Sequence, residues 1–166
     1  SLTAAQLAAS PYADATILKF INTEILDDGE GDMLVLNFEH VTSIEAGVPY
    51  LIQPKSNLGT SKQFTAIPYN QCSEVAQSVE CEHATFHAVL NNGEVIVTAD
   101  APTLILVDQN RLAVVSQNGE MKGLRGYFTL SPTVARLALD GRCYLSVSKP
   151  TPTTVEQITA PKIKES

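Results

Sequence analysis

Short apolar runs bounded by Gly, Pro, Asn and Asp recur along most of the chain, and in two of them alternate positions form an apolar face, a period of two that is typical of half-buried β-strands. Between Met33 and Phe38, alternate side chains are apolar, and the same pattern recurs from Leu124 to Leu130. Leu124, Gly126, Phe128 and Leu130 are therefore expected on one face of their strand. Strands are predicted at Ala15 to Leu26, Met33 to Phe38, Val48 to Gln53, Gln63 to Pro68, Phe86 to Leu90, Val95 to Thr98, Thr103 to Val107, Leu112 to Val115, Leu124 to Leu130, Val134 to Leu139 and Cys143 to Val147.

Clusters of Gly, Asn and Asp separate these runs and predict tight connections between neighbouring strands. Asn91-Asn-Gly93 is a strong hairpin signal, because Asn and Gly tolerate a positive φ. Asp108 to Arg111 and Asp140-Gly141 are two further expected turns. About ten short strands at roughly ten-residue spacing predict an all-β fold, an antiparallel two-sheet sandwich of the jelly-roll or Ig-like kind. No βαβ rhythm is present, which argues against a parallel sheet.

One short N-terminal helix is predicted. Thr3 and Gln6 form the sequence pattern of a capping box, Ala4 to Ala9 are good helix formers, and Ser10-Pro11 ends the run. Glu74 to Val79 is a weaker helical possibility. We expect one β-sandwich domain over residues 1–149, followed by a Pro- and Thr-rich linker and tail over residues 150–166.

The net charge of the chain argues against some classes of binding partner. The 166 residues carry a formal net charge of −7, and the eleven Lys and Arg residues are scattered. Nucleic acids and anionic membranes are therefore disfavoured as partners. No apolar run approaches the roughly 20 residues that cross a bilayer, so we predict no membrane insertion.

The cysteines leave two alternatives open. In an exported protein Cys72 and Cys81 are close enough in sequence to form a disulfide, whereas in a reducing compartment all three cysteines would stay free. Cys143 is expected to pack as a small hydrophobic residue in either case.

Candidate chemistry is sparse. Cys81, His83 and His87 would share one face of a strand, but structural zinc needs a fourth ligand, such as His40 or Cys72. Cys81 or Cys143 beside His87 would make a nucleophile pair, without any motif for an oxyanion site. We therefore predict no catalytic residues, no metal and no cofactor, and the ligand-binding residues stay unknown.

Two further hypotheses concern calcium and sugars. Asp27, Asp28, Glu30 and Asp32 are possible calcium ligands, but a solvated, charge-rich turn is the favoured interpretation because the twelve-residue calcium loop with its closing Glu is absent. The side chains able to stack on sugars are Tyr12, Tyr50, Tyr69, Tyr127 and Tyr144. Trp is absent, which weakens the prediction of a carbohydrate-binding surface.

Two blocks carry a resemblance to a known family. Glu45-Ala-Gly-Val-Pro-Tyr-Leu-Ile-Gln-Pro54 and Met121-Lys-Gly-Leu-Arg-Gly-Tyr-Phe128 resemble a β-sandwich domain found near the C-terminal ends of large surface proteins of Bacteroides-type bacteria. Leu124 and Gly126 depart mildly from the second block, and the segment from Asn70 to His83 is longer than usual. The family's upstream strand ought to precede Ser1, so we expect an exposed or otherwise paired sheet edge beside the N-terminal helix.

The resemblance implies a location and a broad role. It implies a non-catalytic accessory domain of an exported protein at the extracellular or outer-membrane surface, serving as a structural spacer or an adhesion-type interaction module. Its partners would be neighbouring domains of a larger chain and a surface glycan or protein. The alternative is a carbohydrate-binding module of a glycan-processing protein, and a hydrolase ranks last.

Overall fold

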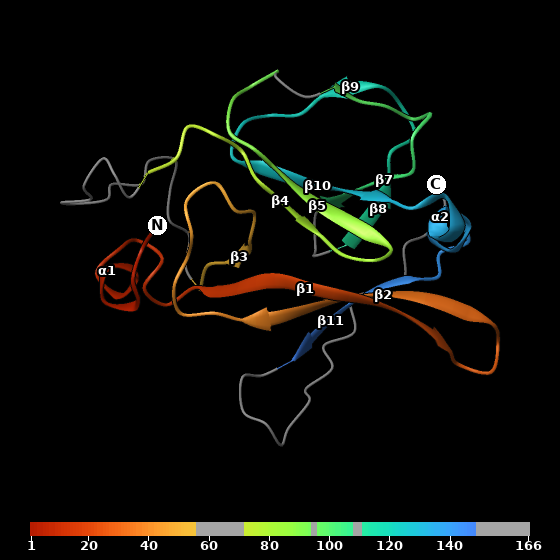
Figure 1. Ribbon diagram of the computed structural model, residues 1–166, viewed down its shortest axis with the longest axis horizontal. Coiled ribbons are helices and arrows are strands. Elements are labelled where there is room, and N and C mark those ends of the chain that lie inside the picture. Colours follow the sequence, from red (N-terminus) through yellow and green to blue (C-terminus); the bar gives the residue numbers. More distant parts are fainter. Residues whose placement is uncertain (56–71, 94–95, 108–110, 149–166) are drawn as a thin grey trace.

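The computed structural model describes residues 1–55, 72–93, 96–107 and 111–148 (Figure 1). The strand predicted at Gln63 to Pro68, Tyr69, most of the turn from Asp108 and the tail over residues 150–166 lie outside the described residues. Within them the chain is an all-β sandwich of two sheets, as the alternating pattern predicts. The two sheets lie one above the other in Figure 1, and the core lies between them.

The first sheet has four strands in the order β11-β2-β1-β3. Its strands are β1 (Thr16–Asp27), β2 (Asp32–His40), β3 (Leu51–Gln53) and β11 (Cys143–Ser148). β1 and β2 form a long antiparallel hairpin, in which Phe20 lies opposite Phe38. β3 pairs with β1 only from Thr16 to Leu18. From Lys19 onward, the outer edge of β1 has no strand partner among the described residues.

The second sheet has five strands in the order β4-β5-β10-β7-β8 and is antiparallel throughout. Its strands are β4 (Ser78–Glu80), β5 (Ala84–Val89), β7 (Thr103–Val107), β8 (Arg111–Val114) and β10 (Arg125–Leu130). A separate two-stranded ribbon pairs β6 (Ile96–Val97) with β9 (Gly119–Glu120). β4 occupies part of the segment proposed as a possible helix from Glu74.

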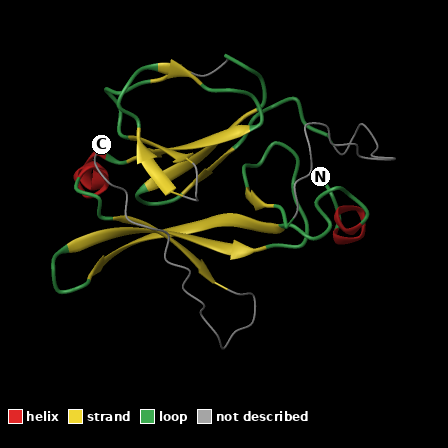
Figure 2. Ribbon diagram, turned by 180° about the vertical axis from the view of Figure 1, so that it is seen from behind, coloured by secondary structure: helices red, strands yellow, loops and turns green. Residues whose placement is uncertain are grey.

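Two helices lie at opposite ends of the molecule (Figure 2). α1 (Ala4–Ala8) begins at Thr3 with the predicted capping box, since the Thr3 hydroxyl accepts from the Gln6 amide and the Gln6 side chain accepts from the Thr3 amide. α2 (Pro132–Leu139) replaces the strand predicted at Val134 to Leu139, and that prediction is wrong. Val134 and Ala138 are four residues apart, so a helix buries both on one side.

The last strand of the first sheet also departs from the prediction of purely antiparallel pairing. β11 pairs parallel with β2, with Cys143 opposite Leu34 and Val147 opposite Phe38. α2 carries the chain from the second sheet to the first, so β11 enters beside β2 in the same direction. A crossover of this kind is what a parallel pair requires.

The hairpin predicted at Asn91 to Gly93 does not form. Gly93 has the expected positive φ of 73°, but β5 and β6, which flank it, are not paired with each other. β5 lies between β4 and β10, and β6 pairs with β9. The Asn-Asn-Gly sequence therefore predicts the backbone conformation of Gly93 correctly. The strands that pair with β5 and β6 are distant in sequence, and the local sequence does not specify them.

Four phenylalanines form the centre of the core. Phe20 and Phe38 come from paired positions of the first sheet, and Phe86 and Phe128 from paired positions of the second. Phe20 contacts Phe38 and Phe128 at ring-centroid distances of 5.2 and 5.6 Å. A β-bulge after Phe20 changes the phase of β1, so that Thr23 is buried as well. The apolar residues Leu51, Phe128 and Leu130 are all expected to be buried; Phe128 and Leu130 are, whereas Leu51 is only half-buried.

Candidate functional site

The first matched block, Glu45 to Pro54, forms a turn that joins the two sheets. Gly47 has a φ of 81°, and a Cβ there would lie 2.5 Å from the carbonyl oxygen of Val75. The Gly47 carbonyl accepts from the amide of Gln77 at 3.0 Å, directly before β4. The Tyr50 hydroxyl accepts from the amide of Glu45 at 3.0 Å. The block is therefore used to build the fold.

The acidic turn considered for calcium holds an arginine. Arg142, at the entry to β11, donates to the Asp28 carboxylate at 2.7 Å and to the carbonyls of Gly31 and Asp32 at 2.8 and 3.1 Å. Its guanidinium also lies 3.9 Å from the carboxylate of Glu30. The hydrogen bond from Arg142 is the main reason that the pKa of Asp28 lies below its ordinary value of 3.8. This turn therefore clamps β11 to the β1–β2 hairpin.

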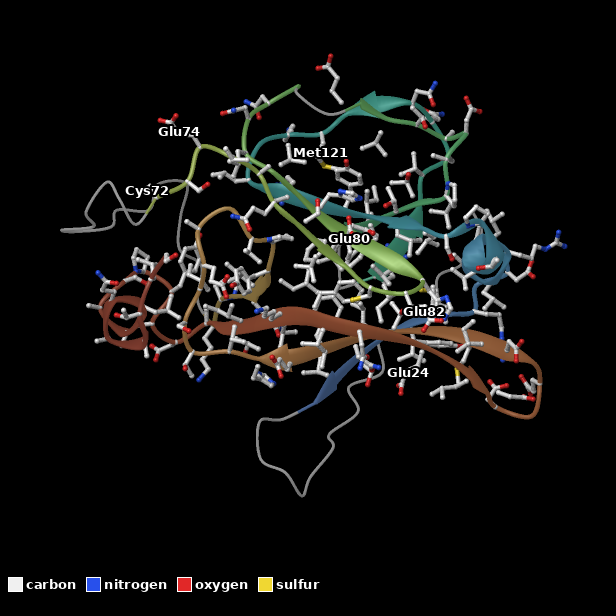
Figure 3. The ribbon with its side chains drawn as sticks, in the orientation of Figure 1. Glu24, Cys72, Glu74, Glu80, Glu82 and Met121 are labelled. Atoms are coloured by element: carbon white, nitrogen blue, oxygen red, sulfur yellow. The ribbon has the colours of Figure 1, made fainter. Side chains whose placement is uncertain are left out.

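The three cysteines are free thiols in the structure, so the predicted Cys72–Cys81 bridge is not formed there. Cys72 is exposed on the segment before β4 (Figure 3). Cys81 is half-buried against the main core, and burial raises the pKa of its thiol. Cys143 is fully buried, and burial raises its pKa to about 12. Cys143 is thus a core residue, as predicted.

A polar cluster on β4, β5 and β10 surrounds His87, and the two hydroxyl residues that bind its ring, Ser78 and Thr129, were not among the candidates from the sequence. The Nδ1 atom of His87 lies 2.9 Å from the Ser78 hydroxyl, and its Nε2 atom lies 2.7 Å from the Thr129 hydroxyl. The ring stacks on that of Tyr127 at a centroid distance of 4.7 Å. Burial lowers the pKa of His87, and the nearby Glu80 carboxylate acts in the opposite direction. The cluster joins three strands through neutral hydrogen bonds.

The Thr129 hydroxyl, which contacts the second ring nitrogen of His87, argues against catalysis by this cluster. Ser78 and His87 are at the distance of a nucleophile and its base. In a catalytic triad, however, a carboxylate on the other ring nitrogen stabilises the imidazolium that forms. Here the Thr129 hydroxyl occupies that position, and it carries no charge. The arrangement therefore favours a structural role.

The residues considered as zinc ligands, Cys81, His83 and His87, each make a different contact within the fold. The amide of His83 donates to the Thr23 hydroxyl at 3.1 Å and thereby joins the β4–β5 turn to the first sheet. Cys81 donates its amide to the carbonyl of Ala84 within the same turn. His87 makes the contacts given above. In the described ranges of the chain, no three His, Cys, Asp or Glu side chains form a group that could hold a metal ion.

The four tyrosines that the structure describes are divided among different parts of the fold. Tyr12 and Tyr50 pack against a small second core built on Leu2, Leu7 and Ile17. Tyr127 stacks on His87 in the second sheet, whereas Tyr144 belongs to β11 in the first. These four rings do not form one row of stacking platforms for a sugar.

Leu124 departs most clearly from the predicted pattern. It was expected on the same face of its strand as Phe128 and Leu130, which are buried, but 85 % of the surface of Leu124 is exposed. Its φ is +59°, and it is the only residue besides glycine with a positive φ in the described part of the chain. Because this dihedral rotates the backbone directly before β10, Leu124 falls out of the alternation. The Leu124 side chain is available for contact with another molecule.

Comparison of the chain with models of known protein families, with curated proteins and with solved structures finds no match. Among the described residues, neither helix has the length and apolar character needed to cross a membrane.

Proposed function

We propose that this chain is a non-catalytic accessory domain of an exported bacterial surface protein, acting as an adhesion-type interaction module. One observation carries the proposal: the histidine, the acidic turn and the buried cysteine that were considered for catalysis or metal binding are used inside the fold. Both ring nitrogens of His87 are hydrogen-bonded, Arg142 clamps the acidic turn, and Cys143 lies in the core. This arrangement leaves the surface as the part of the molecule available for function.

The extracellular or outer-membrane location, and the neighbouring domains of a larger chain, belong to the same proposal. They are supported by the resemblance of the two blocks, whose residues have the structural roles expected of a domain signature. Gly47 and Tyr50 shape a turn, and Phe128 fills the core. An interaction module is favoured over a passive spacer because Leu124 is 85 % exposed and is held at a positive φ of 59°, an unfavourable backbone conformation of the kind that is retained at binding sites.

The catalytic part of the proposal is tested with chromogenic esters and glycosides. We expect turnover equal to the buffer blank, and equal for the wild type, Ser78→Ala and His87→Ala. Hydrolysis by the wild type that disappears in both variants would contradict a non-catalytic role and assign the His87 cluster to catalysis.

The binding part is tested with labelled chain on immobilised collagen, fibrinogen and mucin and on a glycan array. Saturable binding to a protein surface is expected from an adhesion-type module. Saturable binding confined to glycans would instead support the carbohydrate-binding alternative. Absence of binding to every surface would count against an interaction module and favour a spacer.

A further inference from the structure

The turn that leads into β10 holds Leu124 in a conformation that leucine disfavours. A left-handed backbone brings the Cβ of any residue except glycine close to its own peptide groups, so a leucine there costs folding free energy. The Leu124 side chain gains little burial in return, because 85 % of it is exposed. A side chain that imposes strain and is also exposed contributes nothing evident to folding, which points to a role in binding.

The neighbouring contacts fix this conformation. The amide of Leu124 donates to the carbonyl of Val89 at 2.8 Å, and the amide of Gly123 donates to Oδ1 of Asn92 at 2.7 Å. A Cβ on Gly123 would lie 2.7 Å from the carbonyl oxygen of Leu90, so only glycine allows the turn to pack this closely against the end of β5. The turn therefore presents Leu124 in a preorganised position, which lowers the entropy lost on binding.

A second exposed apolar side chain lies at the same end of the sheet. Val75 is 69 % exposed, and only Leu124 exceeds it among the large apolar residues described. The amide of Ala88 donates to the carbonyl of Gln77, so the segment that contains Val75 leads into β4 beside the end of β5. Leu124 leads into β10 beside the same end of β5, on its other side. Figure 3 shows Glu74, the neighbour of Val75, on the loop before β4.

The charges around Leu124 differ in sign from the charge of the whole molecule. Lys122 and Arg125 are exposed on either side of Leu124, and neither takes part in an ion pair within the described residues. The chain as a whole carries a net charge of −7. We refer to Leu124, Lys122 and Arg125, which are close together in sequence, as the Leu124 surface.

We propose that the Leu124 surface docks a protein partner that offers an apolar pocket for Leu124, edged by carboxylates that meet Lys122 and Arg125. This inference rests on the proposed function as an interaction module and names the chemistry of its partner. Protein interfaces commonly place apolar side chains at a dehydrated centre and polar side chains at the rim, which is the arrangement proposed for Leu124 with Lys122 and Arg125. A protein is favoured over an anionic lipid surface because the net charge of −7 would repel the latter.

The test selects random dodecapeptides displayed on phage against the whole chain. We expect the selected peptides to combine apolar and acidic residues, and their binding to weaken at least tenfold with Leu124→Gly. The paired substitution Lys122→Gln with Arg125→Gln should weaken binding and reduce its dependence on salt. The matched control is Leu139→Ser, because Leu139 is also an exposed leucine, 45 % exposed at the end of α2.

Stability measurements separate binding from folding. Glycine adopts a positive φ without strain, so Leu124→Gly should keep or raise the melting temperature while binding is lost. A clear drop in melting temperature would instead make Leu124 a structural residue and overturn the inference.

The remaining outcomes are also decisive. Peptides that bind equally well to Leu124→Gly would overturn the Leu124 surface, yet would still support an interaction module acting elsewhere. Selection of no peptide would reject the partner chemistry, and the immobilised-protein assay would decide the proposed function independently. Leu124-dependent sedimentation with phosphatidylglycerol vesicles would replace the protein partner with a lipid surface.

Discussion

The ring of Phe86 lies directly over the backbone of Gly126, on the neighbouring strand of the second sheet. A Cβ added to Gly126 would come within 2.6 Å of Cε2 of Phe86, closer than side-chain atoms approach in folded proteins. The Phe86 ring cannot move aside easily, because it is stacked on Phe128 at a centroid distance of 4.3 Å. Glycine at position 126 thus allows the two rings to stack in the core.

The first prediction follows from this contact. Gly126→Ala should lower the free energy of unfolding by about 1–3 kcal/mol, the usual cost of overpacking a core. Gly119→Ala is the matched control, because no atom lies within 4 Å of a Cβ at that position. Urea denaturation of both variants provides the measurement. Equal stability of the two variants would show that Phe86 does not constrain position 126.

The second prediction concerns the phenylalanine cluster. Phe128 is 1 % exposed and contacts rings from both sheets. Phe128→Ala should therefore cost about 3–5 kcal/mol, while Leu106→Ala, at an exposed position of β7, should cost less than about 1 kcal/mol. Both values can be obtained from chemical denaturation. A loss below about 1 kcal/mol for Phe128→Ala would argue against the two-sheet core.

The third prediction is a pH dependence at the Arg142 clamp. The pKa of Asp28 is lowered in the folded protein, so its carboxylate stabilises the fold above the ordinary pKa of 3.8, and this contribution is lost as the pH falls through the lowered pKa. The wild type should therefore be more stable than Asp28→Asn near neutral pH, and the difference should shrink on acidification. Thermal unfolding across the acidic range measures this difference.

The control for the clamp is Asp14→Asn. Asp14 is exposed and takes part in no ion pair within the described residues, so its replacement should change stability little at any pH. If Asp28→Asn behaved like Asp14→Asn throughout, the hydrogen bond from Arg142 to Asp28 would contribute nothing to folding.

The fourth prediction orders the cysteines by reactivity. Iodoacetamide should modify exposed Cys72 first and half-buried Cys81 more slowly, because burial raises the pKa of Cys81. Cys143 should react only after unfolding, since it is inaccessible and its pKa is about 12. Peptide mass spectrometry at successive times measures the order. Labelling of Cys143 as fast as Cys72 would contradict its place in the core.

The disulfide remains a separate prediction for the exported protein. Protein recovered from an oxidising compartment should show one free thiol when denatured without reductant, because Cys72 and Cys81 would be paired. Three free thiols in the same preparation would reject the bridge.

The alternating pattern was sufficient to predict the two sheets, but it did not identify α2 or the parallel strand. Val134, Leu137 and Ala138 follow a helical spacing, and Ser131-Pro132 before them is a common start of a helix. This run is only eight residues long, so its apolar residues are also compatible with a strand. The partner of β11 depends on where the crossover delivers the chain, which local sequence does not record.

The candidate site was even less accessible to prediction. His87 could be singled out by residue type, but its partners Ser78 and Thr129 are ordinary hydroxyl residues 9 and 42 positions away. Their proximity arises from strand pairing alone. Leu124 was assigned to the same face as Phe128 and Leu130 because alternation is counted without dihedral angles, and the Gly123-Leu124 sequence gives no sign of the positive φ.

The parallel pairing of β11 has a consequence for how the protein is made. β2 is complete at residue 40, whereas β11 begins at residue 143, so at about 5–20 residues per second a ribosome adds the missing neighbour roughly 5–20 s later. Arg142 and Asp28, which fasten that neighbour, are 114 positions apart. Until then a nascent chain carries an open edge on β2, which contributes Leu34, Leu36 and Phe38 to the core. We expect the first sheet to assemble only after the second, and chaperones to protect β2 during the interval.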